Sequence, residues 1–210
     1  MEGEFNRGEA KRSVLTVGQG RGFVVKSAEH LLVIMAAHCL PHLPFADPAA
    51  EAEQRTYRKL LGLLGDEPTL TTECLFVDPV SGLAVLGPPP ESLPDEGDAY
   101  KRVVGSAMTF SIAPMEGDSS RGWLLSLAGN WFSCNMSHYD GGLWVTEASQ
   151  GIIGGMPGSP ILADDGAVIG VVSCSSGSNG DIHTAGGPNP CLAHHLPVWL
   201  WRDLSAGLGD

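Results

Sequence analysis

Three short segments of this 210-residue chain carry the residues best suited to chemistry. In residues 35–41, MAAHCLP, His38 follows small residues at the end of an apolar run. Residues 80–86 read VSGLAVL, and residues 154–162 read GGMPGSPIL. Acyl transfer by a catalytic triad needs a hydroxyl that attacks, a histidine that takes its proton and a buried aspartate that orients the imidazole. The order of the three segments is suggestive of such a unit.

Taken together, the segments resemble the trypsin-like serine peptidases of the chymotrypsin fold. They look most like the bacterial intracellular proteins that carry a trypsin-like peptidase domain. That family has an AAHC segment with the histidine, a D-[IL]-A-[LV]-L strand with the aspartate and a G-x-S-G-[GS]-P segment with the nucleophile. The resemblance covers roughly residues 13–204. It implies two antiparallel six-stranded β-barrels with an active cleft between them.

Only one of the three catalytic positions is kept under this resemblance. His38 occupies the general-base position, but Gly82 stands at the aspartate position and Pro157 at the serine position. The family's oxyanion hole uses the N–H of the nucleophile and that of the glycine two residues earlier, here Gly155. Proline has neither a hydroxyl nor a backbone N–H, and one lost oxyanion donor costs about 2.7 to 4 kcal/mol. The resemblance therefore implies a peptidase homologue without proteolytic activity, acting as a protein- or peptide-binding or regulatory module.

An alternative stays open, an active serine endopeptidase with a non-standard or partner-completed catalytic site. Asp78 lies four residues before the aspartate position. On an extended strand its carboxylate would therefore lie roughly 13 Å from the place where the triad needs one. Ser159 follows the serine position by two residues and faces a similar direction if that stretch is extended. Cys39 and Cys174 are further nucleophile candidates, although small buried cysteines commonly serve as core residues.

The resemblance also assigns a substrate pocket to two stretches. These are Gly151 and Ile152 ahead of the serine position, and Ser173, Cys174 and Ser175 at a later strand end. Gly151 stands where a trypsin-type enzyme holds an acidic residue. The pocket is therefore uncharged at that position, and a basic side chain has no evident reason to bind. A second interpretation of these residues, as barrel core and turns, stays open.

The composition favours a fold rich in turns and short strands. The 28 glycines and 15 prolines make up about a fifth of the chain, against roughly 12% in an average protein. Charged residues contribute 17% and hydrophobic residues 43%. These values exclude a coiled coil, a long helical bundle and a disordered chain. We therefore expect an all-β fold, and the resemblance specifies it as two antiparallel six-stranded β-barrels.

The domain organisation follows from the same patterns. We expect a flexible arm over residues 1–12 and a first barrel with His38 over 13–104. A second barrel with a C-terminal helix is expected over 105–210. A Pro-rich acidic stretch at 87–98 predicts a connector between them.

Two helices and a series of short strands are predicted within these domains. Apolar residues at helical spacing predict a helix inserted in the first half, over 49–64, and a C-terminal one over 196–204. Short apolar runs between Gly, Asp, Asn and Ser turns predict strands. These lie at 14–17, 22–26, 31–35, 70–76, 83–86, 107–112, 122–127, 131–138, 143–147, 159–162 and 168–173.

The charge balance argues against polyanionic partners. The chain has 12 basic and 24 acidic residues, a net charge of −12 and a pI near 4.8. Such a surface repels nucleic-acid phosphates and anionic membranes. The longest apolar run, residues 31–37, is far shorter than the ~20 residues that span a bilayer. We expect neither nucleic acid nor a membrane as partner, but a protein or peptide in the former cleft or on the barrel surface.

Cysteine and histidine usage predicts a reduced protein without a cofactor. The five cysteines are an odd number without a CxxC pair, and the first residues lack the basic-then-apolar pattern of a secretion signal. Both observations favour buried thiols in a cytoplasmic protein. His194 and His195 are adjacent and point to opposite faces of an extended chain, so we expect no metal ligands.

Overall fold

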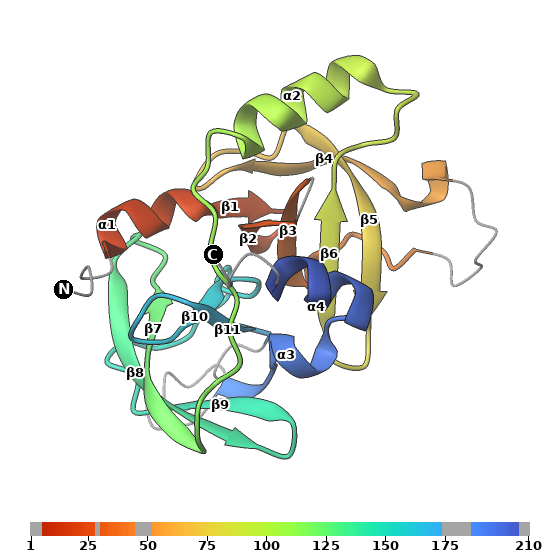
Figure 1. Ribbon diagram of the computed structural model, residues 1–210. Helices are drawn as coiled ribbons and strands as arrows, with labels where there is room; N and C mark the ends of the chain where they lie inside the picture. Colours follow the sequence, from red (N-terminus) through yellow and green to blue (C-terminus); the bar gives the residue numbers. More distant parts are fainter. Residues whose placement is uncertain (1–5, 28–29, 45–51, 174–185, 206–210) are drawn as a thin grey trace.

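The computed structural model describes residues 6–27, 30–44, 52–173 and 186–205 (Figure 1). Its first six strands form a closed antiparallel barrel in the order β1-β2-β3-β6-β5-β4. Phe23, Ile34 and Leu86 are fully buried in its core. The strands are β1 (Val14–Val17), β2 (Gly20–Lys26), β3 (Leu31–Ala36), β4 (Thr56–Leu63), β5 (Leu70–Asp78) and β6 (Leu83–Gly87).

The second six strands form one antiparallel sheet in the order β11-β10-β7-β8-β9-β12. An isolated bridge joins Gly170 of β11 to Cys191, the residue after β12, so the sheet curls into a nearly closed barrel. The prediction of an all-β fold with two six-stranded antiparallel barrels is confirmed. The strands are β7 (Ser119–Leu125), β8 (Trp131–Tyr139), β9 (Gly142–Thr146), β10 (Pro160–Leu162), β11 (Val168–Val171) and β12 (Gly186–Pro190).

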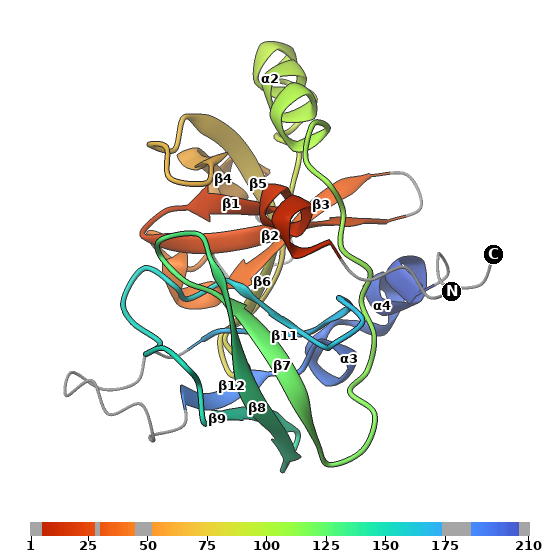
Figure 2. The same cartoon turned by 90° about the vertical axis from the view of Figure 1, so that its left-hand side faces the viewer.

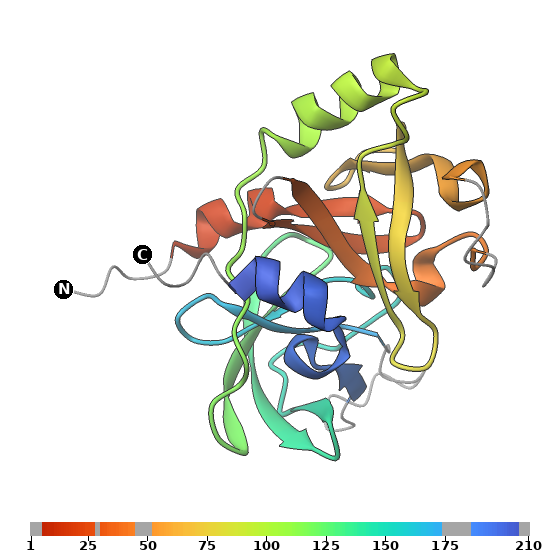
Figure 3. The same ribbon diagram turned by 45° about the vertical axis from the view of Figure 1, so that its right-hand side comes forward.

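Short helices lie on the outside of the barrels (Figures 2 and 3). α2 covers the first barrel, and α4 confirms the predicted C-terminal helix, with Leu200 and Leu204 buried. Within the described ranges, none of the helices combines the length and the apolar character that crossing a membrane requires. The helices are α1 (Arg7–Ala10), η1 (Lys11–Ser13), η2 (Ala37–Cys39), η3 (Ala52–Arg55), α2 (Pro94–Val104), α3 (Leu192–His195) and α4 (Val198–Ser205).

The prediction of a helix over residues 49–64 is wrong, because residues 56–63 form strand β4 and only the short η3 precedes it. Residues 49–51 lie outside the described residues. Lys59 has a left-handed φ of 52°, and the pairing of β4 with β5 shifts register between Tyr57 and Leu61. This bulge interrupts the two-residue alternation of the strand, so that side chains three and four positions apart face the core. The apolar spacing that indicated a helix is therefore that of a bulged strand.

A longer helix, α2, does occur in the first half, and it begins within the stretch predicted as a connector. α2 begins at Pro94, whose missing N–H costs nothing in a first helical turn. Acidic residues in its first turn and basic residues in its last turn complement the helix dipole. The buried Tyr100 hydroxyl donates to the Leu31 carbonyl, 3.0 Å away, and so ties α2 to the first barrel.

The strand predicted over 107–112 is also absent. These residues make only isolated bridges, Phe110 with Val25 of the first barrel and Ile112 with Val168 of the second. A segment that passes from one barrel to the other has no continuous partner strand, so its apolar residues pack without forming a ladder.

Part of the stretch predicted as a flexible arm is folded onto the second barrel. Residues 1–5 lie outside the described residues, but α1 and η1 follow them. The Trp131 indole N–H donates to the Arg7 carbonyl, 2.7 Å away. The Arg7 guanidinium lies 3.6 Å from the centre of the Trp123 ring, a cation–π contact.

The two barrels meet where β2 passes the segment before β10. The Arg21 N–H donates to the Pro157 carbonyl, 2.8 Å away. Gly158 has a φ of +87°, and a Cβ there would overlap the Arg21 carbonyl oxygen. Only glycine allows both the left-handed backbone and this close approach. Gly158 therefore sets how closely the barrels approach at this point.

We expect Gly158→Ala to destabilise the protein strongly, because the added methyl group meets backbone atoms of the other barrel. The matched control is Gly117→Ala, since Gly117 also has a positive φ, 72°, but its Cβ would meet nothing within 4 Å. The control measures the cost of the left-handed backbone, roughly 1–2 kcal/mol. In urea unfolding, Gly158→Ala should lose at least about 2 kcal/mol more than the control. Equal losses would contradict the importance of this contact.

Candidate functional site

His38 lies in a cavity of about 490 Å³ that residues from both barrels line. The Ala37 N–H donates to the Gly82 carbonyl, 2.8 Å away. This bond holds η2, which follows β3, against the start of β6, and so brings His38 beside Gly82. The His38 side chain is exposed. The lining consists of Ala37, His38, Leu40, His42, Leu43, Pro79, Val80, Ser81, Gly82, Ser173 and Pro188.

Gly82 lies in the β5–β6 turn with a φ of +77°, a conformation that favours glycine. A Cβ at this position would lie 3.9 Å from the Ser173 Cβ, and both residues line the His38 cavity. A side chain on residue 82 would therefore enter the cavity that holds the His38 ring. Glycine supplies no carboxylate there.

Asp78, the carboxylate nearest in sequence, is engaged in the same turn. Its Oδ1 accepts the Val80 N–H at 2.9 Å, and its carbonyl accepts the Gly82 N–H at 2.9 Å. Burial by itself raises the pKa of the Asp78 carboxyl, but hydrogen bonds from Ser81 and Val80 and the nearby His195 outweigh burial and lower the pKa. The Asp78 carboxylate therefore closes the turn that carries Gly82.

Pro157 is buried where the second barrel touches the first. Its carbonyl oxygen accepts the Arg21 N–H, and the Cys39 sulfur lies 3.8 Å from the same oxygen. Because Cys39 follows His38, the structure brings the segment at the serine position against the segment of the histidine. Position 157 presents a proline ring, with no hydroxyl and no N–H.

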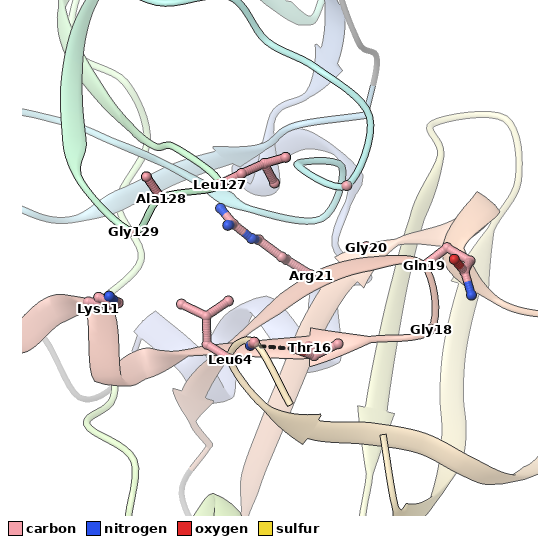
Figure 4. Close-up of a pocket in the computed structure, with 12 residues that line it drawn as sticks. Lys11, Thr16, Gly18, Gln19, Gly20, Arg21, Leu64, Leu127, Ala128 and Gly129 are labelled. Atoms are coloured by element: carbon pink, nitrogen blue, oxygen red, sulfur yellow. Dashed lines mark hydrogen bonds between the residues drawn. The ribbon is translucent and has the colours of Figure 1, made fainter. Parts of the chain in front are cut away.

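Gly155 borders a second cavity, of about 440 Å³, rather than the one that holds His38. Lys11 and Arg21 line this second cavity as well (Figure 4). The Arg21 guanidinium donates to the carbonyls of Leu125 and Ser126, 2.7 and 2.9 Å away. Burial lowers the pKa of Arg21, but an arginine stays charged at neutral pH. The second cavity therefore carries positive charge in an acidic protein.

Two of the substitute nucleophiles weighed from the sequence, Ser159 and Cys39, are buried. Ser159 is 0% exposed, and its Oγ lies 3.5 Å from a guanidinium nitrogen of Arg21. Burial raises the pKa of Cys39 to about 11, so its reactive thiolate is scarce at neutral pH. Cys174 lies outside the described residues. Neither Ser159 nor Cys39 is therefore placed or ionised for attack.

The three described residues among those assigned to a substrate pocket, Gly151, Ile152 and Ser173, lie in different surroundings. Ile152 is 3% exposed and belongs to the core of the second barrel, whereas Gly151 is half-buried beside Ile153. Ser173 lines the His38 cavity, and its N–H donates to the Asn189 side chain, 2.8 Å away. The two remaining residues, Cys174 and Ser175, lie outside the described residues.

Sequence reasoning missed three residues that shape the site. Val80 is 96% exposed and Leu43 49% exposed, and both line the His38 cavity. For Val80, the sequence did offer a signal, because an apolar residue directly after a proline stands in what the structure shows to be the β5–β6 turn. Arg21 was missed although it is a lone cation between two glycines in a strand that is otherwise apolar until Lys26.

Comparison with known proteins identifies the fold. No family model matches the chain, and no curated protein matches it in sequence. A serine protease of a human pathogenic astrovirus matches in structure with 12% identity and a TM-score of 0.54, covering 89% of this chain and 94% of that chain. Rv3671c from M. tuberculosis, in an inactive serine-to-alanine form, matches with 14% identity and a TM-score of 0.55, covering 100% and 94%. The chain thus has the chymotrypsin-like fold of the trypsin-like serine proteases.

We expect Asp78→Asn to destabilise the protein in a pH-dependent way. A carboxyl whose pKa is lowered by folding stabilises the native state above its ordinary value of 3.8 and loses that contribution as the pH falls below it. The variant should therefore lose up to about 1 kcal/mol at neutral pH and little at about pH 3. Urea unfolding at both pH values measures the difference. Asp66→Asn, at an exposed loop carboxylate, is the control, and an equal pH dependence in both variants would refute this role for Asp78.

Proposed function

We propose that this chain is a trypsin-like serine peptidase homologue that does not cleave peptides and instead binds a protein or peptide partner at the His38 cavity. The observation that carries the proposal is Pro157. At the position where the resemblance expects a nucleophile, the chain has no hydroxyl and no N–H, and the proline carbonyl is used by Arg21 in the contact between the barrels.

The rim of the His38 cavity supports a binding role. A valine that is 96% exposed, Val80, and the half-exposed Leu43 lie together on its lining. Exposed apolar side chains that gather around a hollow are typical of contact sites. No Asp, Glu, Lys or Arg occurs among the described residues that line this cavity. The partner therefore inserts an uncharged, apolar side chain.

The proposal includes a reducing, cytoplasmic environment. Cys39, Cys74, Cys134 and Cys191 are all buried free thiols. Buried thiols without disulfides suit a compartment that keeps cysteines reduced.

We expect no labelling of the wild-type protein by a fluorophosphonate probe, because position 157 has no hydroxyl and Ser159 is buried. The double variant Gly82→Asp with Pro157→Ser restores a carboxylate, a hydroxyl and a backbone N–H, and it should label. The matched control, Gly82→Asp with Pro157→Ala, restores the carboxylate and the N–H without the hydroxyl and should not. Mass spectrometry of the labelled residue measures the outcome.

Two outcomes would contradict these assignments. Wild-type labelling that depends on His38 would support the alternative, an active serine endopeptidase. A folded double variant that neither labels nor cleaves would show that Gly82 and Pro157 are not the missing triad members. Because residue 82 has a left-handed φ, the aspartate there costs roughly 1 kcal/mol of stability, and circular dichroism confirms folding first.

We expect Val80→Asp to weaken binding of a partner at least about tenfold, because it places a charge on an apolar contact. Peptides selected from a displayed library by the wild-type protein serve as the partner, and calorimetry measures affinity. The matched control is Val198→Asp, since Val198 is 65% exposed and lies outside the cavity lining. Equal affinities for both variants, or no selected peptide, would refute binding at the His38 cavity.

A further inference from the structure

Three metal-ligating side chains gather where the second barrel closes. His138 lies near the end of β8, Cys191 follows β12, and His194 lies on α3. One ligand atom from each, two imidazole nitrogens and one sulfur, all lie within 4.8 Å of one another. The cluster is separate from the His38 cavity, and none of its residues lines that cavity.

The three side chains have little else to bind. The Nε2 atom of His138 is buried and has no hydrogen-bond partner among the described residues. Its ring centre lies 5.0 Å from that of His194, and the two rings are tilted by 33°. Cys191 is 2% exposed and is not in a disulfide. A buried imidazole nitrogen without a partner is costly, and a metal ion would satisfy it.

We propose that His138, Cys191 and His194 form a zinc site with one open coordination position. Two imidazoles and a thiolate are a donor set that suits Zn²⁺. Tetrahedral zinc with its usual bond lengths places such ligand atoms about 3.3 to 3.6 Å apart. The atoms here therefore need to approach by up to about 1 Å, and the exposed His194 side chain can rotate toward the other two. A solvent molecule or a further ligand completes the fourth position.

The backbone between Cys191 and His194 holds two of the three ligands close together. The His194 N–H donates to the Cys191 carbonyl, 3.1 Å away, so both residues lie in one turn of α3 and its cap.

The site would complete the closure of the second barrel. β11 and β12 share no ladder, and Cys191 touches β11 through the single bridge to Gly170. A zinc ion would join this point to His138 on β8 and to the first turn of α3. We therefore expect the metal to act as a structural clamp on the C-terminal segment.

No metal ligands were expected here from the sequence, because His194 and His195 were weighed as a pair without a carboxylate or cysteine at ligand spacing. Cys191, three residues before His194, was overlooked. The spacing between Cys191 and His194 suits a metal site, but two ligands do not define one, and His138 joins them only through the fold.

Cobalt binding tests the proposal directly. The reduced, metal-free, tag-free protein is titrated with Co²⁺, which reports a bound thiolate by a charge-transfer band and tetrahedral geometry by its visible spectrum. We expect one Co²⁺ per chain with both signals, and displacement by one Zn²⁺. Cys191→Ser should abolish the charge-transfer band. His138→Gln and His194→Ala should weaken binding at least about tenfold.

Two controls separate the site from general metal binding. His195→Ala removes the neighbouring histidine, whose Nδ1 faces the Cys191 carbonyl instead, and Cys74→Ser removes a buried thiol of the first barrel. Both should keep the spectrum and the affinity of the wild type. Because His194 is exposed, His194→Ala should remain folded even if Cys191→Ser does not.

Thermal unfolding gives a second readout. Zinc should raise the melting temperature of the wild-type protein progressively with its concentration, and it should do so much less in His194→Ala. Absence of stoichiometric Co²⁺ binding, or an unchanged spectrum in His194→Ala, would overturn the proposal. These measurements need no partner, so their failure would leave the proposed function unaffected.

Discussion

A buried guanidinium between the barrels constrains the whole molecule. Arg21 is 5% exposed, and its side chain reaches from β2 to two carbonyls at the end of β7. A buried cation must be fully hydrogen-bonded to be tolerated, and no described carboxylate is in an ion pair with it. The carbonyls must therefore stay in place, which fixes the first barrel relative to the second. Around the same residue, Pro157 and Gly158 pack against the Arg21 backbone.

This contact explains how the cleft can keep its shape whichever side chains stand at positions 82 and 157. The segment at the serine position is held by Arg21 and Cys39, which need its carbonyl and its close approach but no hydroxyl. The β5–β6 turn is likewise closed by Asp78, whether or not residue 82 has a carboxylate. The forces that shape the cleft are thus independent of the groups that would react in it.

The sequence predicted most of the strands from short apolar runs between turns, but it predicted two six-stranded barrels only through the resemblance. It placed His38 and Gly82 in one cavity only through the resemblance. It could not predict β4, because a bulge at Lys59 gives a strand the apolar spacing of a helix. It also could not assign a partner to Arg21 or His138, because those contacts join residues that are distant in sequence and carry no local pattern.

The short helix α3 lies between the three candidate metal ligands and the turn that borders the His38 cavity. Adjacent residues on a helix point about 100° apart, so His194 can face His138 while His195 faces elsewhere. His195 interacts electrostatically with Asp78, and Asp78 closes the turn whose residues Val80 and Gly82 line the His38 cavity. A metal that fixed α3 would therefore also fix the position of His195 beside this turn. The binding surface and the clamp would then be mechanically linked, although they share no residue.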